Sequence, residues 1–138
     1  MLTKNSKLIF VGDSITDCGR VRPFSEGRGA LGAGYVSFVN AHIEVFHPQL
    51  RVRIINSGIG GNTVRDLKER WNADVFEHDP DWVSVMIGIN DVWRHFDNPA
   101  RSNTHVSLRE YSETLDNLVF QTQSRGIKVI LVSPYFLE

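Results

Sequence analysis

The chain has 138 residues, with 15 basic and 16 acidic side chains and a formal net charge of −1. This length predicts one domain, and the balanced charge argues against nucleic acid or an anionic membrane as a partner. A single cysteine excludes an internal disulfide. The first apolar run, Leu8 to Val11, is too short for the core of a signal peptide. We therefore expect a cytoplasmic protein.

Strand-like and helix-like segments alternate along the chain, which indicates a parallel α/β sheet. In chain order, the pattern predicts a strand at 7–12, a helix from about 35 that ends near 48, a strand at 51–56, a helix from 62 or 63 to 75, a strand at 82–88, a helix from the Ser107-x-x-Glu110 capping box to Gly126, and a strand at 127–132. Segments 17–33 and 94–105 are predicted as long loops.

The composition of the strands indicates which of them lie inside the sheet and which lie at an edge. The strand at 82–88 is apolar throughout, as expected for a strand covered on both faces. The strand at 51–56 carries charges, which suggests an edge position. We adopt as a hypothesis a three-layer α/β/α, flavodoxin-like sheet with the strand order 2-1-3-4.

Polar and glycine-rich turns follow the first three predicted strands. They are Gly12-Asp13-Ser14-Ile15, Asn56-Ser57-Gly58-Ile59-Gly60-Gly61-Asn62 and Gly88-Ile89-Asn90-Asp91. In open parallel sheets, sites form outside the carboxyl ends of the strands, so these turns are expected to meet. Ser14 is the candidate nucleophile. Its own N–H, the N–H of Gly61 and the side-chain amide of Asn90 are candidate donors to an oxyanion.

Other residues near these turns have a structural explanation beside a functional one. Asp13 and Asp91 are expected to support the site by accepting hydrogen bonds from local backbone N–H groups. Trp93 is a candidate wall of the substrate site, although aromatic packing explains it equally well. Ser14 alone could cap a turn, and only the three turns together favour catalysis.

At these residues the sequence resembles the SGNH (GDSL-like) hydrolase superfamily. Gly12 to Ile15 match its first block with isoleucine in place of leucine, Gly61 matches the glycine of the second, and Gly88 to Asp91 match the third. The strings GDSITDCGR, GNTVRDL and MIGINDVWR are similar to the branch that contains bacterial acetylxylan esterases. The resemblance implies a serine esterase that hydrolyses short acyl esters, acetyl above all, on carbohydrate through an acyl-serine. It implies no metal and no organic cofactor.

The fourth block of that family, Asp-x-x-His, supplies the general base and the aspartate that orients it. None of the five histidines here has an aspartate three positions earlier. The fifth strand and the last helix of the family fold are also missing. We therefore expect residues 1–138 to form a single, C-terminally incomplete domain that is inactive alone. We also expect it to self-associate through the exposed edge of its sheet.

Two other functions remain open from the sequence. One is a non-catalytic binding module that keeps the pocket of this fold but lacks the base. The other is a flavodoxin-like phosphotransfer or nucleotide-binding domain with Asp13, Asp17 and Asp91 around magnesium. No phosphate-binding loop of the form G-x-x-x-x-G-K-[ST] accompanies those aspartates, which argues against the second alternative.

Overall fold

The computed structural model describes residues 1–23, 25–97 and 99–134, and its strands form one parallel sheet in the order β2-β1-β3-β4. The predicted order is therefore confirmed. The strands are β1 Lys7–Gly12, β2 Arg53–Gly58, β3 Trp82–Met86 and β4 Lys128–Leu131. The α-helices are α1 Ser14–Asp17, α2 Tyr35–Phe46, α3 Val64–Asp74, α4 Ile89–Asp97 and α5 Leu108–Ser124, and 3₁₀ turns lie at Pro48–Leu50, Phe76–His78 and Ser102–Thr104.

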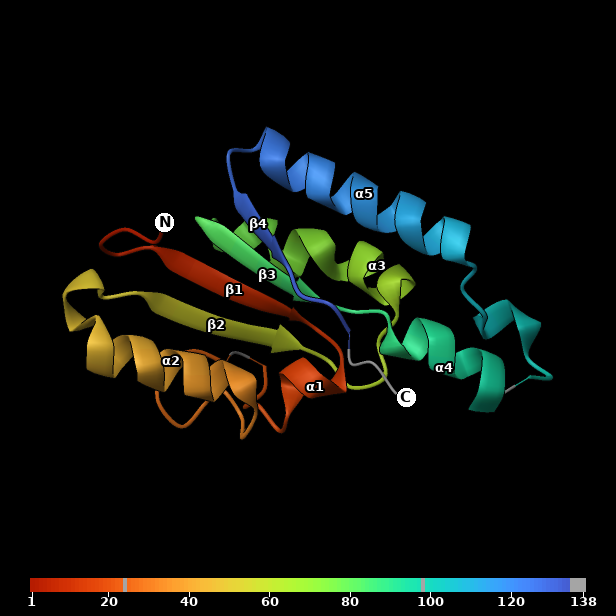
Figure 1. Cartoon of the computed structure of the whole chain (residues 1–138), viewed down its shortest axis with the longest axis horizontal. Coiled ribbons are helices and arrows are strands. Elements are labelled where there is room, and N and C mark those ends of the chain that lie inside the picture. Colours follow the sequence, from red (N-terminus) through yellow and green to blue (C-terminus); the bar gives the residue numbers. More distant parts are fainter. Residues whose placement is uncertain (24, 98, 135–138) are drawn as a thin grey trace.

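Helices cover both faces of the sheet and complete the expected three layers (Figure 1). Helix α2 packs on one face, where Val36 meets Leu8, Phe10 and Ile54. Helices α3 and α5 pack on the other face, where the largest cluster of buried side chains includes Ile9, Val11, Leu67, Trp71, Val83, Val85 and Leu118. Apolar burial on both faces of β1 and β3 explains why the sequences of these strands are almost free of polar residues.

Helix α5 begins at the predicted capping box, and helix α3 begins at a similar local cap that the sequence prediction did not name. Ser107 Oγ accepts a hydrogen bond from the N–H of Glu110 at 3.1 Å at the start of α5. Gly126, with φ +79°, follows the C-cap of α5 in the left-handed conformation. At the start of α3, the N–H of Thr63 donates to Asp66 Oδ2 at 2.7 Å. Both helix starts are therefore encoded locally.

Several boundaries differ from the prediction, and β3 ends at Met86, two residues before its predicted end at 88. Strand β2 runs from Arg53 to Gly58, two residues further along than predicted, because the edge strand extends into the turn that Asn56 organises. Helix α1 occupies 14–17, in the turn that precedes the predicted loop at 17–33. Helix α4 occupies 89–97, where the sequence predicted a turn followed by a loop from 94 onward. Both helices are short and depend on contacts with their neighbours rather than on propensity.

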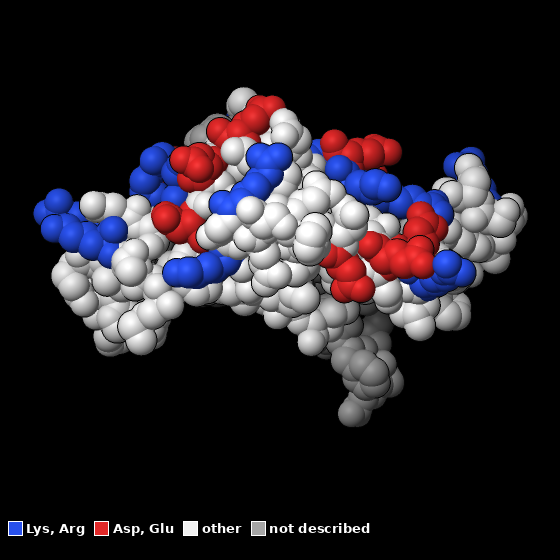
Figure 2. All heavy atoms as spheres, turned by 90° about the horizontal axis from the view of Figure 1, so that it is seen from above, with Lys and Arg blue, Asp and Glu red and all other residues white. Residues whose placement is uncertain are grey.

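The sheet ends in a strand with apolar side chains in contact with solvent. Ile130, Leu131 and Val132 are 39%, 56% and 37% exposed on the β4 edge. Figure 2 shows basic and acidic side chains interspersed on the α5 side, without an extended patch of one sign on that face. None of the helices in the described ranges is long and apolar enough to cross a bilayer.

Candidate active site

Ser14 lies at the carboxyl end of the central strand β1, as the first residue of α1, and is exposed to solvent. The preceding Gly12 has no space for a side chain, since an added Cβ would lie 2.3 Å from both Met86 O and Thr16 Oγ1. The chain can therefore turn sharply after β1 only with glycine at this position. This turn directs residue 14 toward the end of the sheet.

The glycine-rich turn after β2 lies beside Ser14. The N–H of Ile59 donates to Gly12 O at 3.0 Å, and the N–H of Gly60 donates to Asp17 Oδ2 at 3.1 Å. A Cβ built on Gly60 would lie 3.8 Å from the Cβ of Ser14. Gly61 has φ +82°, a conformation that glycine adopts without strain. The backbone of this turn can therefore approach a group that is bound at Ser14.

Asn90 is the second residue of α4, and its side chain reaches the glycine-rich turn. Its Nδ2 donates to Asn62 O at 2.9 Å. A side-chain amide has two N–H donors, so one remains for a ligand. Because Asn62 directly follows Gly61, this bond holds the Asn90 amide beside the predicted oxyanion glycine.

Asp13 and Asp91 are buried, with 1% and 4% of their surface exposed. Asp13 Oδ1 accepts a hydrogen bond from the N–H of Ile15 at 2.9 Å and so caps α1. The Asp91 carboxylate accepts from the N–H of Val64 at 3.0 and 3.3 Å and so ties α4 to the start of α3. Burial raises the pKa of both carboxyls, and hydrogen bonds from backbone N–H groups oppose this in part. Both side chains contact backbone, as a supporting role requires.

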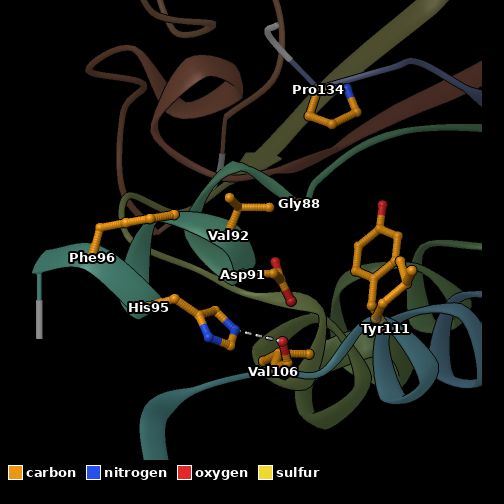
Figure 3. A pocket seen from close by; sticks show the side chains of 9 residues that line it. Gly88, Asp91, Val92, His95, Phe96, Val106, Tyr111 and Pro134 are labelled. Carbon is orange, nitrogen blue, oxygen red and sulfur yellow. Dashed lines mark hydrogen bonds between the residues drawn. The ribbon is translucent and has the colours of Figure 1, made fainter. Parts of the chain in front are cut away.

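Helix α4 separates two environments. Trp93, three residues after Asn90, is 49% exposed, and this spacing places both on one side of the helix. A cavity of about 530 Å³ lies along the other side (Figure 3). It is lined by Gly88, Asp91, Val92, His95, Phe96, Val106, Leu108, Tyr111 and Pro134. His95 Nε2 lies 3.0 Å from Val106 O in its wall, so this ring contacts a backbone carbonyl.

Asn56, which received no role from the sequence, connects β2 to the nucleophile turn. Its buried Nδ2 donates to Thr16 O at 2.7 Å and to Leu31 O at 2.8 Å, while its Oδ1 accepts from the N–H of Gly58 at 2.9 Å. The sequence signal for it was a single amide side chain after the apolar pair Ile54-Ile55, at the start of the glycine-rich turn.

Arg70 was missed in the same way. On α3 it reaches back to the carboxyl ends of β1 and β2, where it donates to Gly12 O and Ser57 O. Helical periodicity alone places Arg70 on the solvent-exposed face of the helix. No sequence pattern predicts that its side chain folds back over the end of the sheet.

No group of three or more His, Cys, Asp or Glu side chains within the described ranges is arranged to hold a metal ion. The three aspartates of the magnesium alternative have other partners. Asp13 binds backbone, Asp17 binds Arg22 and Gly60, and Asp91 binds backbone. In the described residues, each of these three carboxylates is thus bonded to backbone N–H groups or to Arg22.

A serine at the tip of the central strand, beside a glycine-rich turn and a tethered asparagine amide, is typical of serine acyl hydrolases. The chain belongs to the GDSL-like lipase/acylhydrolase family, whose model matches residues 10–138. It is 54% identical over 133 residues to an acetylxylan esterase of Geobacillus stearothermophilus, a match that covers 96% of this chain and 61% of the relative.

Solved structures agree with this assignment. The crystal structure of Axe2, an acetylxylan esterase from G. stearothermophilus, superposes with a TM-score of 0.96 at 52% identity and covers 99% of this chain and 63% of Axe2. LAE5, an alpha/beta hydrolase from the metagenome of Lake Arreo, gives 0.94 at 50% identity and covers 99% and 63%. Catalytic mutants of Axe2 replace a serine, an aspartate and a histidine three positions after that aspartate. The chain spans about three fifths of the length of these relatives.

Proposed function

We propose that this chain carries the nucleophile and the oxyanion hole of an SGNH-type esterase that removes acetyl groups from carbohydrate. The observation that carries the proposal is the network of hydrogen bonds that joins the Ser14 turn, the Gly61 turn and Asn90. The 54% identity to an acetylxylan esterase supports acetyl and carbohydrate as the two halves of the ester.

The proposed reaction proceeds through an acyl-serine. Ser14 Oγ attacks the ester carbonyl carbon, and its proton passes to a general base. The resulting oxyanion accepts hydrogen bonds from the N–H groups of Ser14 and Gly61 and from the free Asn90 amide hydrogen. Collapse of this intermediate breaks the ester bond and releases the sugar hydroxyl, which takes up the proton. Water then hydrolyses the acetyl-serine to acetate.

Residues 1–138 lack the Asp-x-x-His block that supplies the general base in this family. No histidine follows an aspartate at the Asp-x-x-His spacing. A serine hydroxyl without a base is a weak nucleophile at neutral pH. An external base should therefore restore the first half of the reaction if the rest of the site is in place.

Acetylation of Ser14 in the presence of imidazole tests this proposal. With 4-nitrophenyl acetate as donor and imidazole as the base, we expect Ser14 to be acetylated at least about tenfold faster than exposed Ser112 on α5, because a positioned hydroxyl with oxyanion donors reacts faster than an ordinary one. Peptide mass spectrometry measures both serines in one sample. Ser112 corrects for direct transfer from acetylimidazole.

Two further measurements sharpen this test. Asn90→Ala should slow acetylation of Ser14 by about a hundredfold, the usual cost of one lost oxyanion donor, and leave Ser112 unchanged. The acetyl-serine should persist after imidazole is removed, because deacylation also needs the base. Equal acetylation of Ser14 and Ser112 would contradict the proposed function.

We also propose that the chain self-associates through the edge of β4. The exposed side chains of Ile130, Leu131 and Val132 accompany unpaired backbone groups on that edge. Light scattering on the purified chain should give a mass above that of the monomer, and Ile130→Lys should lower it. A monomer at high concentration would count against this proposal.

A further inference from the structure

We propose that Arg70 is a positioning residue that holds the three parts of the acyl-transfer site in register. The inference rests on the proposed function and adds to it a residue outside the motifs that carry the chemistry. Arg70 lies on α3, which is anchored to the sheet by the buried side chains of Leu67 and Trp71. Its own side chain is only 14% exposed.

The guanidinium contacts the ends of β1 and β2 next to the site. Its Nη2 donates to Gly12 O at 3.0 Å, two residues before Ser14. Its Nη1 donates to Ser57 O at 2.7 Å, at the start of the glycine-rich turn. Gly12 O also accepts from the N–H of Ile59 at 3.0 Å, so the guanidinium and the backbone join the same two strand ends.

The third nitrogen extends the network to the remaining donor. Arg70 Nε donates to Asn62 Oδ1 at 2.8 Å. The carbonyl of Asn62 accepts from Asn90 Nδ2, and its N–H donates to Ile59 O at 3.3 Å. One side chain is thus bonded, directly or through Asn62, to the Ser14 turn, to the Gly61 turn and to Asn90.

Arginine is suited to this position by its shape. The planar guanidinium directs donors from three nitrogens along fixed directions, whereas the lysine ammonium is a single centre and cannot reach the three acceptors together. Asp74, one turn further along α3, forms an ion pair with Nη1 and helps to orient the guanidinium of Arg70. An oxyanion hole stabilises its ligand only when its donors are correctly placed. Loss of the Arg70 guanidinium should therefore slow acyl transfer although every donor of the oxyanion hole remains.

The test uses the imidazole-dependent acetylation of Ser14, with Ser112 as the internal reference. We expect Arg70→Lys to slow acetylation of Ser14 by about 10- to 100-fold, the cost of a shift of about 1 Å in a catalytic group. Methylguanidinium added to Arg70→Gly should restore part of the rate. Faster hydrogen exchange at the amide of Ile59 in the same variants would report the loosened turns directly.

Arg65→Lys on the same helix is the matched control. Arg65 bonds Glu110 and the carbonyls of Asn103 and His105, on the side of α3 that faces α5. This variant should lower the melting temperature and leave acetylation of Ser14 unchanged. Arg70→Lys that acetylates Ser14 at the wild-type rate would overturn the positioning role and leave the proposed function standing. Wild-type protein with no preference for Ser14 would overturn both.

Discussion

Residues 1–138 alone are expected to hydrolyse 4-nitrophenyl acetate about a millionfold more slowly than an esterase with a complete triad, the cost of removing histidine from a comparable triad. The physical reason is the proton of Ser14. Attack on the ester leaves a positive charge on the nucleophile oxygen unless a base accepts that proton, and the five histidines of this chain lack the Asp-x-x-His spacing. The oxyanion donors remain, so a small Ser14-dependent rate is compatible with the expectation.

Ser14→Ala is the control for this prediction. Without added imidazole, both proteins should release 4-nitrophenolate at rates that differ little, as measured by absorbance. A fast rate that disappears in Ser14→Ala would contradict the prediction and would require a base within these residues. Calorimetric binding of an acetylated xylo-oligosaccharide without turnover would instead favour the non-catalytic binding module.

Asn56→Ala should lower the free energy of unfolding by about 4 kcal/mol, because an unsatisfied buried polar group costs about 1–3 kcal/mol. The substitution removes bonds to three backbone groups, namely Thr16 O, Leu31 O and the N–H of Gly58. The side chain is 0% exposed, so bulk water does not readily replace them. For a domain of ordinary stability, about 5–15 kcal/mol, this is a large fraction of the total. Urea denaturation followed by circular dichroism measures the effect.

Asn40→Ala is the matched control for Asn56→Ala. Asn40 is also buried, at 8% exposure, but among the described residues its amide donates one hydrogen bond, to Glu44 Oε1 one turn further along α2. We expect a loss below about 1 kcal/mol, as for a single hydrogen bond between side chains. Equal losses in the two variants would show that the three bonds of Asn56 add no more than the single side-chain bond of Asn40.

Much of the fold was predictable because its signals are local. The capping box at Ser107 and the glycine at 126 mark the ends of α5, and the apolar run after Trp82 marks a strand covered on both faces. The charged residues at the start of β2 indicated only an edge position, and the full strand order was a hypothesis based on the flavodoxin-like arrangement, which the sheet confirms. Helix α4 was not predicted at all, because its nine residues gain their stability from neighbours rather than from propensity.

The candidate residues Ser14, Gly61 and Asn90 could be identified before folding is considered, because turn chemistry and the motifs of the family consist of consecutive residues. The contacts that hold these residues together became visible only in the folded chain. Asn56 and Arg70 act across 40 and 58 positions of the chain, on Thr16 O and Gly12 O. Their acceptors are backbone carbonyls, which every residue possesses, so no pattern of side chains can reveal such contacts before the sheet brings its strand ends together.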